Sequence, residues 1–271
     1  MWRTLEPVHG MIYFAPEAAA AYKEAGLRDP AAGYFASRSA PMGAVTAEVV
    51  IATFFNFNPA LVRRAIPAAW AEATPERLVA ARLQVADIAL TRVLGDDVVR
   101  GAEMAEAARL ARTAADGCRP EGRPLAAGHL SLAWPDAPHL VLWHAIAILR
   151  EYRGDGHIAA LTAEGVTGCE ALVIHAATGE VGRPVLQSTR GWSDDEWATA
   201  VEGLQARGWI DRDADFTAGG RAHRQWVEDR TDAMAVGPWS ALGEDDCRRL
   251  RHLVRPWSQA VVAEGALMPQ R

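Results

Sequence analysis

One histidine interrupts the most apolar run of the chain, HLVLWHAIAILREY. His144 lies between Leu140 and Leu149, and Glu151 follows seven residues later, which at helical spacing places both on one face, two turns apart. An imidazole in such surroundings can bind a ligand or transfer a proton near neutral pH. The alternative is a core histidine that has a hydrogen-bond partner. If the protein turns a ligand over, we expect His144 to transfer the proton, with Glu151 or Arg150 orienting the substrate.

Charged side chains gather where this apolar run gives way to glycine-bracketed sequence. Arg150, Glu151, Arg153, Asp155 and His157 follow one another here, and the glycines between them predict that the helix ends at this point. One interpretation is the polar mouth of a pocket, in which an arginine holds an anion. The other is a solvated helix end, where cations favour the helix dipole.

The segment FFNFNP combines aromatic rings and amides at a predicted helix break. This mixture is typical of a small-molecule pocket, although core aromatics and an asparagine cap before Pro59 would explain it equally. We expect a cavity between the two halves of the chain, lined by Tyr13, Phe55, Asn56, Asn58, Trp143 and His144. The further ligand-binding candidates are His9, Arg153, His157 and His175.

Metal and cofactor sites find little support in the sequence. His9, His144 and His175 come from separate segments and form no spaced ligand motif. Binding of zinc or haem by one or more of them stays open. The segment around Gly179 is not a dinucleotide fingerprint, because no strand precedes it. We predict no metal and no cofactor.

Composition narrows the class of protein. The chain has 271 residues and a formal net charge of −6, which argues against a general binder of nucleic acid or anionic membranes. Three cysteines without a CxxC pair indicate neither a disulfide framework nor a zinc ribbon. No targeting segment or membrane span is evident, so we expect a soluble cytoplasmic protein.

The stretch from Trp192 to Trp226 has the most specific local pattern. Ser193 with Glu196 predicts a capping box that opens a helix, and Gly208 ends this helix. A short extended pair and a second helix follow. Helix, small hairpin and helix are the plan of a winged helix.

Within this stretch, EGLQARGWIDRDADFTAGGRA resembles the recognition helix, wing and following helix of MarR-type regulators. The whole sequence also resembles an actinobacterial family of MarR-like helix-turn-helix proteins without an established activity. The resemblance implies a winged-helix fold and, for a regulator, DNA binding by a homodimer that responds to a ligand.

The charges of the stretch oppose DNA binding. The expected recognition helix begins with Asp194 and Asp195, and the wing carries Asp211, Asp213 and Asp215 with a single arginine. DNA affinity comes largely from cations that neutralise phosphates, although acids in a first helical turn also stabilise the helix. We therefore expect DNA binding to have been lost.

Together these patterns predict a mainly α fold. We expect an N-terminal helical domain at 1–117, a loop or linker at 118–128, and a winged-helix domain with a small two-stranded wing at 129–271. The leading hypothesis is a protein that binds an aromatic or amphipathic small molecule, or a cofactor-independent acid/base enzyme of specialised metabolism. The alternatives are a MarR-type regulator and a pure interaction module.

Overall fold

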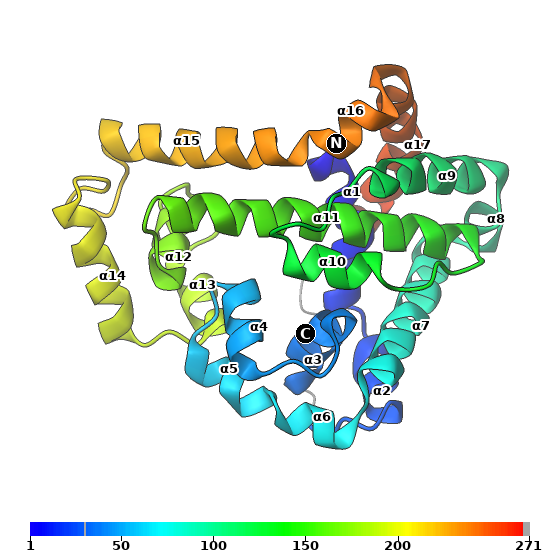
Figure 1. The fold of residues 1–271 in the computed structure, drawn as a ribbon, viewed down its shortest axis with the longest axis horizontal. Helices are drawn as coiled ribbons and strands as arrows, with labels where there is room; N and C mark the ends of the chain where they lie inside the picture. Colours follow the sequence, from blue (N-terminus) through cyan, green and yellow to red (C-terminus); the bar gives the residue numbers. More distant parts are fainter. Residues whose placement is uncertain (30, 268–271) are drawn as a thin grey trace.

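The computed structural model describes residues 1–29 and 31–267, which fold almost entirely into helices (Figure 1). The helices before residue 118 are α1 (Trp2–Gly10), η1 (Met11–Tyr13), α2 (Glu17–Glu24), α3 (Ala32–Ser39), η2 (Ala40–Met42), α4 (Ala47–Phe54), α5 (Pro59–Ala65), α6 (Ala68–Glu72), α7 (Pro75–Leu94), α8 (Asp96–Val99) and α9 (Ala102–Asp116). Those after it are α10 (Pro124–Leu130), α11 (Pro138–Ala163), α12 (Gly168–Ala176), α13 (Arg183–Arg190), α14 (Asp194–Ala206), α15 (Ala218–Ala235), α16 (Gly237–Leu242) and α17 (Glu244–Ala263). The prediction of a mainly α fold is confirmed.

Several helices start at the capping residues that the sequence indicates. Asn58 accepts the N–H of Ala60 at the start of α5. Ser193 and Glu196 form the expected capping box of α14, and Thr217 caps α15. Each cap satisfies N–H groups that the first turn of a helix leaves unpaired.

The central helix α11 is longer than the sequence suggested. It has 26 residues and continues through the glycine-bracketed segment to Ala163, so the helix end expected there is wrong. Gly156 packs against Arg123, the residue before α10. A side chain at position 156 would not fit there, because its Cβ would lie only 2.8 Å from Nη1 of Arg123. Tertiary packing thus outweighs the low helix propensity of glycine. No single helix among the described residues is long and apolar enough to cross a membrane. Only α11 and α12 taken together reach that length and apolarity, and the angle between them is 101°.

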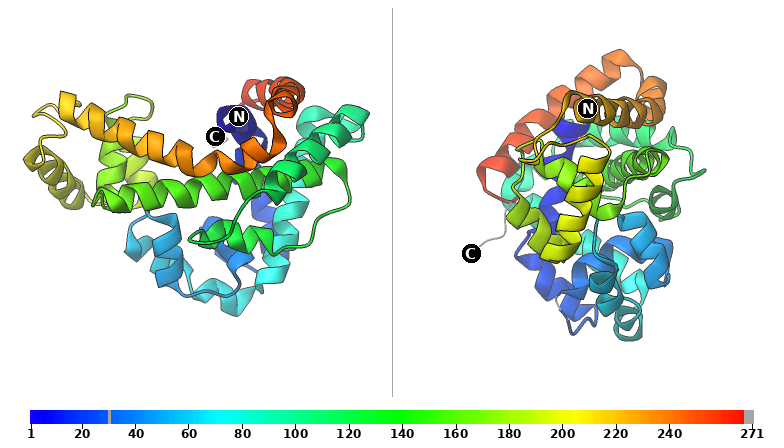
Figure 2. Two further views of the ribbon diagram at one scale, coloured as in Figure 1. Left: turned by 45° about the horizontal axis from the view of Figure 1, so that its top comes forward. Right: turned by 90° about the vertical axis from the view of Figure 1, so that its left-hand side faces the viewer.

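Buried apolar residues form two clusters that meet along α11. The first extends from α1 to the first half of α11 and is closed by α17, which returns to pack on α1 and α9 (Figure 2). The second joins the end of α11 to α12, α13, α14 and part of α15. Along α11, the residues up to Tyr152 belong to the first cluster and those from Ala160 on belong to the second. The segment expected to be a linker does not separate the clusters, because about half of it forms the start of α10 and buries Leu125 in the first one. Independent folding of 1–117 and 129–271 stays a prediction.

Helices α12, α13 and α14 form one end of the molecule, on the left in Figure 1, and α15 runs from this end toward the middle alongside α11. Gly191, in the left-handed conformation with φ 74°, makes the turn between α13 and α14. After α14, a single antiparallel bridge joins Ile210 and Phe216, and the described residues contain no strand. The carboxylate of Asp211 accepts the N–H groups of Asp213 and Asp215, so this segment is a tight turn rather than a two-stranded wing.

Candidate ligand-binding site

Glu151 is the centre of a buried network of charged side chains. Its carboxylate, 1% exposed, accepts bonds of 3.0 and 2.7 Å from Arg38 of α3 and one of 2.8 Å from Arg150. Arg150 also donates to Glu6 of α1 at 3.0 and 3.1 Å, and Arg38 donates to the hydroxyl of Tyr34 at 3.3 Å. Burial favours the neutral form, but the two guanidinium groups outweigh it and hold the pKa of Glu151 well below its usual range.

Arg82 of α7 is a buried arginine without a carboxylate partner among the described residues. Its side chain is held by Nη2, which donates to the hydroxyl of Tyr13 at 2.9 Å and lies 3.5 Å from Nε2 of His9. Nε and Nη1 have no hydrogen-bond partner in the described part of the chain, although the residue is only 2% exposed. Because a guanidinium stays protonated, Arg82 places an unbalanced positive charge inside the protein.

His9, Tyr13 and Trp143 surround this guanidinium. The Tyr13 hydroxyl lies 3.1 Å from Nε2 of His9, and the His9 ring stacks on Trp143 with ring centroids 5.2 Å apart. Nη2 of Arg82 can only donate, and it faces Nε2 of His9 as well as the Tyr13 hydroxyl. We therefore assign Nε2 as an acceptor and place the imidazole proton on Nδ1. Nδ1 of His9 and Nε1 of Trp143 lack partners among the described residues. The unpaired atoms of these three side chains are therefore all N–H donors.

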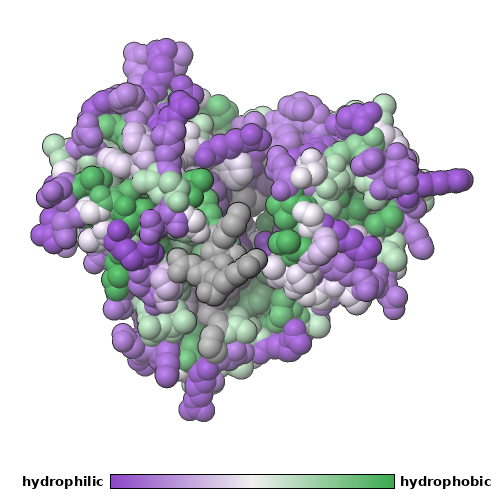
Figure 3. Space-filling view, turned by 180° about the vertical axis from the view of Figure 1, so that it is seen from behind, coloured by the Kyte–Doolittle hydropathy of each residue, from purple (hydrophilic) through white to green (hydrophobic). Residues whose placement is uncertain are grey.

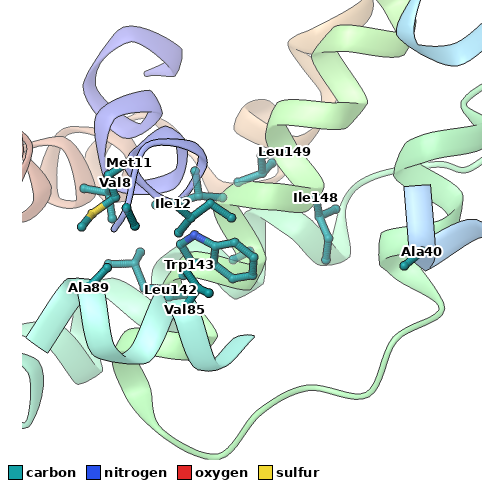
Figure 4. Packing of buried hydrophobic residues seen from close by; sticks show 14 of the residues in the cluster. Val8, Met11, Ile12, Ala40, Val85, Ala89, Leu142, Trp143, Ile148 and Leu149 are labelled. Carbon is teal, nitrogen blue, oxygen red and sulfur yellow. The ribbon is translucent and has the colours of Figure 1, made fainter. Parts of the chain in front are cut away.

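Apolar side chains complete the setting of Trp143. Figure 4 shows the indole between Val85 of α7 and Ile12 of η1, with its nitrogen toward Ile12. All three residues belong to the first apolar cluster. The unpaired donors therefore lie within the core, where water competes little with a ligand.

The groups around Glu151 and Arg82 meet where the rings of Tyr13 and Tyr34 lie edge-to-face, 5.2 Å apart between centroids. We call them together the polar cluster: Glu6, His9, Tyr13, Tyr34, Arg38, Arg82, Trp143, Arg150 and Glu151. Arg190 of α13 lies nearby, 4.6 Å from the Phe57 ring, and its Nε also has no partner among the described residues. Seen from behind, the surface is hollowed between the lobe that contains α12, α13 and α14, on the right, and the rest of the molecule (Figure 3).

The contacts of His144 are with other residues than those of Glu151. Its ring meets Trp134 edge-on at 4.8 Å between centroids and is 6.3 Å from the ring of His129. Burial, reinforced by the charge of Arg82, lowers the pKa of His144 to about 4, and burial also lowers the pKa of His129 well below its usual range. Both rings are neutral at pH 7. The described contacts of Glu151 are with arginines rather than with His144, whose catalytic role stays a prediction.

The FFNFNP segment contacts both the polar cluster and the corner between α13 and α14. On one side, the Phe54 ring lies 4.3 Å from the guanidinium carbon of Arg38, and the Phe57 ring is 5.4 Å from that of Tyr34. Asn58 donates to the Glu196 carboxylate at 2.9 and 3.1 Å, and Trp192 donates its indole N–H to the carbonyl of Asn56 at 2.9 Å. Phe55 packs against the second apolar cluster, whereas Trp143 belongs to the first. The expected cavity wall is thus divided between two places. We call residues 55–58 the clasp, because they hold the corner between α13 and α14.

Two further ligand candidates connect α11 to α15. Arg153 lies 3.1 Å from both Glu228 and Asp232, and Nδ1 of His157 lies 3.0 Å from the hydroxyl of Thr231. Burial lowers the pKa of His157, which favours its neutral form. These contacts hold two helices together and lie outside the polar cluster.

The three histidines considered for zinc or haem have different surroundings. His9 stacks on Trp143, His144 faces Trp134, and His175 lies on α12, which packs against α13 and α14. Across residues 1–29 and 31–267, no group of three or more His, Cys, Asp or Glu side chains is placed to hold a metal ion.

Two hollows of the surface have defined linings, and neither lining contains the residues expected to form the cavity. The larger, of about 470 Å³, is lined by Ala52, Thr53, Gly122, Pro124, Asp155, Ile158, Ala159, Thr162 and Ala163. Burial raises the pKa of Asp155 in its wall to about 6. The smaller, of about 20 Å³, reaches the polar cluster through Glu6 and Arg150.

The outward face of α14 is acidic. Asp194, Asp195, Glu196 and Glu202 are exposed, and the helix contains no basic residue. Arg183 of α13 approaches this face, but it is paired with Asp194 at 2.7 Å. Among the described residues of α14, nothing offers a cation to a phosphate.

Arg38, Arg82 and His129 were missed by the sequence reasoning, because none belongs to a motif. One signal was available for Arg82. It follows Leu78 by four residues and precedes Val85 by three, which puts a charge on the buried face of α7.

A profile of the Helix-turn-helix family matches residues 1–268, and the chain belongs to this family. No curated protein and no solved structure matches it. The match covers the helices of the polar cluster as well as α12 to α15.

Proposed function

We propose that this member of the helix-turn-helix family binds a small organic molecule at the polar cluster and uses its helix-turn-helix as a scaffold. The unpaired N–H groups of Arg82, His9 and Trp143 support this most strongly. A buried donor without a partner costs about 1–3 kcal/mol, so several in one place favour a ligand that supplies acceptors.

The aromatic side chains of the cluster favour a flat or amphipathic ligand. The rings of Tyr13 and Tyr34 meet edge-to-face at 5.2 Å, and His9 stacks on Trp143. Such rings provide apolar walls, while the arginines supply a few fixed polar contacts. This combination is common in small-molecule sites.

The scaffold role of the helix-turn-helix is supported by the clasp and by the acidic face of α14. In DNA-binding proteins of this type, the start of the recognition helix enters the major groove. Here Glu196, in the first turn of α14, is bonded to Asn58. The order α12, α13, α14, single bridge and α15 supports a MarR-like arrangement that no longer reads DNA.

We also propose that the protein converts this ligand by proton transfer. With a pKa of about 4, His144 is neutral at pH 7, so it can take part as a proton acceptor but not as a donor, and its low pKa makes it a weak base. Glu151 would then position Arg38 and Arg150 toward the substrate, since it binds both. No cofactor is needed for such a proton transfer.

Intrinsic tryptophan fluorescence titrated with a metabolite library tests the binding site. We expect saturable quenching by at least one compound in the wild type, and its loss in Trp143→Phe. Trp257→Phe, which removes a buried tryptophan of α17, is the matched control and should keep the response. An equal response in both variants would contradict binding at the polar cluster.

A second candidate is a ligand-responsive MarR-type regulator that binds DNA as a homodimer. Membership of the family and the solvent-exposed outer face of α14 favour it. Fluorescence anisotropy with promoter DNA of its own operon at low salt decides between the two. Specific, salt-sensitive binding at nanomolar levels that weakens in Arg212→Ala, the arginine of the turn after α14, would establish the regulator.

A further inference from the structure

We infer that Arg82 is the binding group for an oxyanion on the ligand, such as a carboxylate or a phosphate. The inference rests on the proposed ligand binding at the polar cluster and adds the charge of the ligand. It follows from three observations: the balance of buried charge, the kind of unpaired atom, and the mutual contact of the groups that carry these atoms.

The charge balance singles out Arg82. Arg38 and Arg150 share the carboxylate of Glu151, and Arg150 also binds Glu6. The polar cluster thus holds three arginines and two glutamates, and Arg82 is the arginine without an acid partner among the described residues. A buried charge is costly unless it is paired, so the missing partner is an anion.

The unpaired atoms have one chemical character. Arg82 offers the N–H of Nε and the two N–H bonds of Nη1, while His9 and Trp143 each offer one ring N–H. A ligand group that only accepts hydrogen bonds and carries negative charge matches donors of this kind. An ammonium group would leave them unpaired and add a like charge.

The three side chains that carry these donors come from three helices and contact one another. Arg82 lies on α7, His9 on α1 and Trp143 on α11. The guanidinium carbon of Arg82 is 5.3 Å from the Trp143 ring centroid, and its Nη2 is 3.5 Å from Nε2 of His9. One small group placed here would contact side chains from separate parts of the first apolar cluster, and should stabilise the fold.

Thermal unfolding of the full chain in a buffer of bulky sulfonate anions tests the inference. Sodium acetate, benzoate and phosphate are added to the wild type and to Arg82→Met, with benzyl alcohol as the uncharged counterpart of benzoate. Arg112→Met, which removes an exposed arginine of α9, is the matched control. We expect at least one oxyanion to raise the midpoint of the wild type and the control by about 3 °C or more.

Arg82→Met should lose this rise and, without added anion, melt at or above the wild-type temperature, since it removes an unpaired buried charge. A variant that melts several degrees lower and keeps the anion effect would overturn the inference. So would a wild type that none of the three anions stabilises. If benzyl alcohol acts as strongly as benzoate, ligand binding stands but the anion site is refuted.

Arg82→Lys keeps the test independent of how well the methionine variant folds. Lysine retains the charge but replaces the planar donor set by a compact ammonium. We expect its affinity for the stabilising anion to fall about tenfold or more, an effect of the size seen for lost charged hydrogen bonds. Unchanged affinity would show that Arg82 does not bind the anion.

Discussion

Replacing Glu151 by glutamine removes the negative charge at the centre of the polar cluster while changing the side-chain shape little. Arg38 loses its carboxylate partner, and Arg150 keeps only Glu6. Breaking a buried ion pair from one side costs about 3–5 kcal/mol. Because Arg150 retains an acid, we expect the lower end, about 3 kcal/mol. For a chain of this length that corresponds to a fall of roughly 6–12 °C in the unfolding midpoint.

Urea and thermal unfolding at pH 7 measure the effect of Glu151→Gln. The matched control is Glu106→Gln, since Arg249 binds Glu106 with two bonds of 2.9 and 2.6 Å at the surface. There the side chains are 34% and 42% exposed, so we expect a loss below about 1 kcal/mol. Equal losses in the two variants would refute the buried network as described.

The same network has a pH dependence with a defined sign. The pKa of Glu151 is lowered in the folded state, so its stabilising contribution is present above the unfolded pKa of about 4.3 and is lost as the pH falls. The gap between the wild type and Glu151→Gln should therefore narrow below about pH 4. A gap that widens in acid would contradict this assignment.

The remaining predictions concern the larger hollow and the clasp. Burial raises the folded-state pKa of Asp155 to about 6, so its stabilising contribution is present below about pH 4 and is lost as the pH rises through 6. Relative to Asp155→Asn, the wild type should lose up to about 3 kcal/mol between pH 4 and 7, and a difference independent of pH in urea unfolding would contradict this. Asn58→Asp keeps the cap of α5 but sets a second carboxylate against Glu196, which should cost about 1–3 kcal/mol. Adding Glu196→Gln should recover most of that loss, because the new amide can donate to the new carboxylate, and strictly additive effects would show that the two residues do not interact.

The sequence predicts the features of this fold that depend on neighbouring residues. Ser193 and Asn58 indicate helix starts, because their side chains accept backbone N–H groups two or three residues further on. The apolar run around His144 indicates a buried helix. The continuation of α11 was not predictable from neighbouring residues, because the close packing of Arg123 against Gly156 is a contact between residues about 30 positions apart.

The candidate site was predicted only in part, because its bonds are long-range. Glu151 and Arg150 were recognised by their place on α11, but their partners Arg38 and Glu6 are 113 and 144 residues away in the chain. Nothing in local periodicity indicates which arginine meets a given glutamate. The clasp shows the same limit: the break before Pro59 was correctly expected, whereas its contact with α14 required the tertiary fold.

The most direct test of the account is the electron density beside Arg82 in crystals grown with the oxyanion that gives the largest thermal shift. We expect the anion within about 2.7–3.1 Å of Nε or Nη1 of Arg82, with the ring N–H of His9 or Trp143 as a further donor. Density in which these atoms bind only water or other protein groups, with the anion elsewhere, would contradict it.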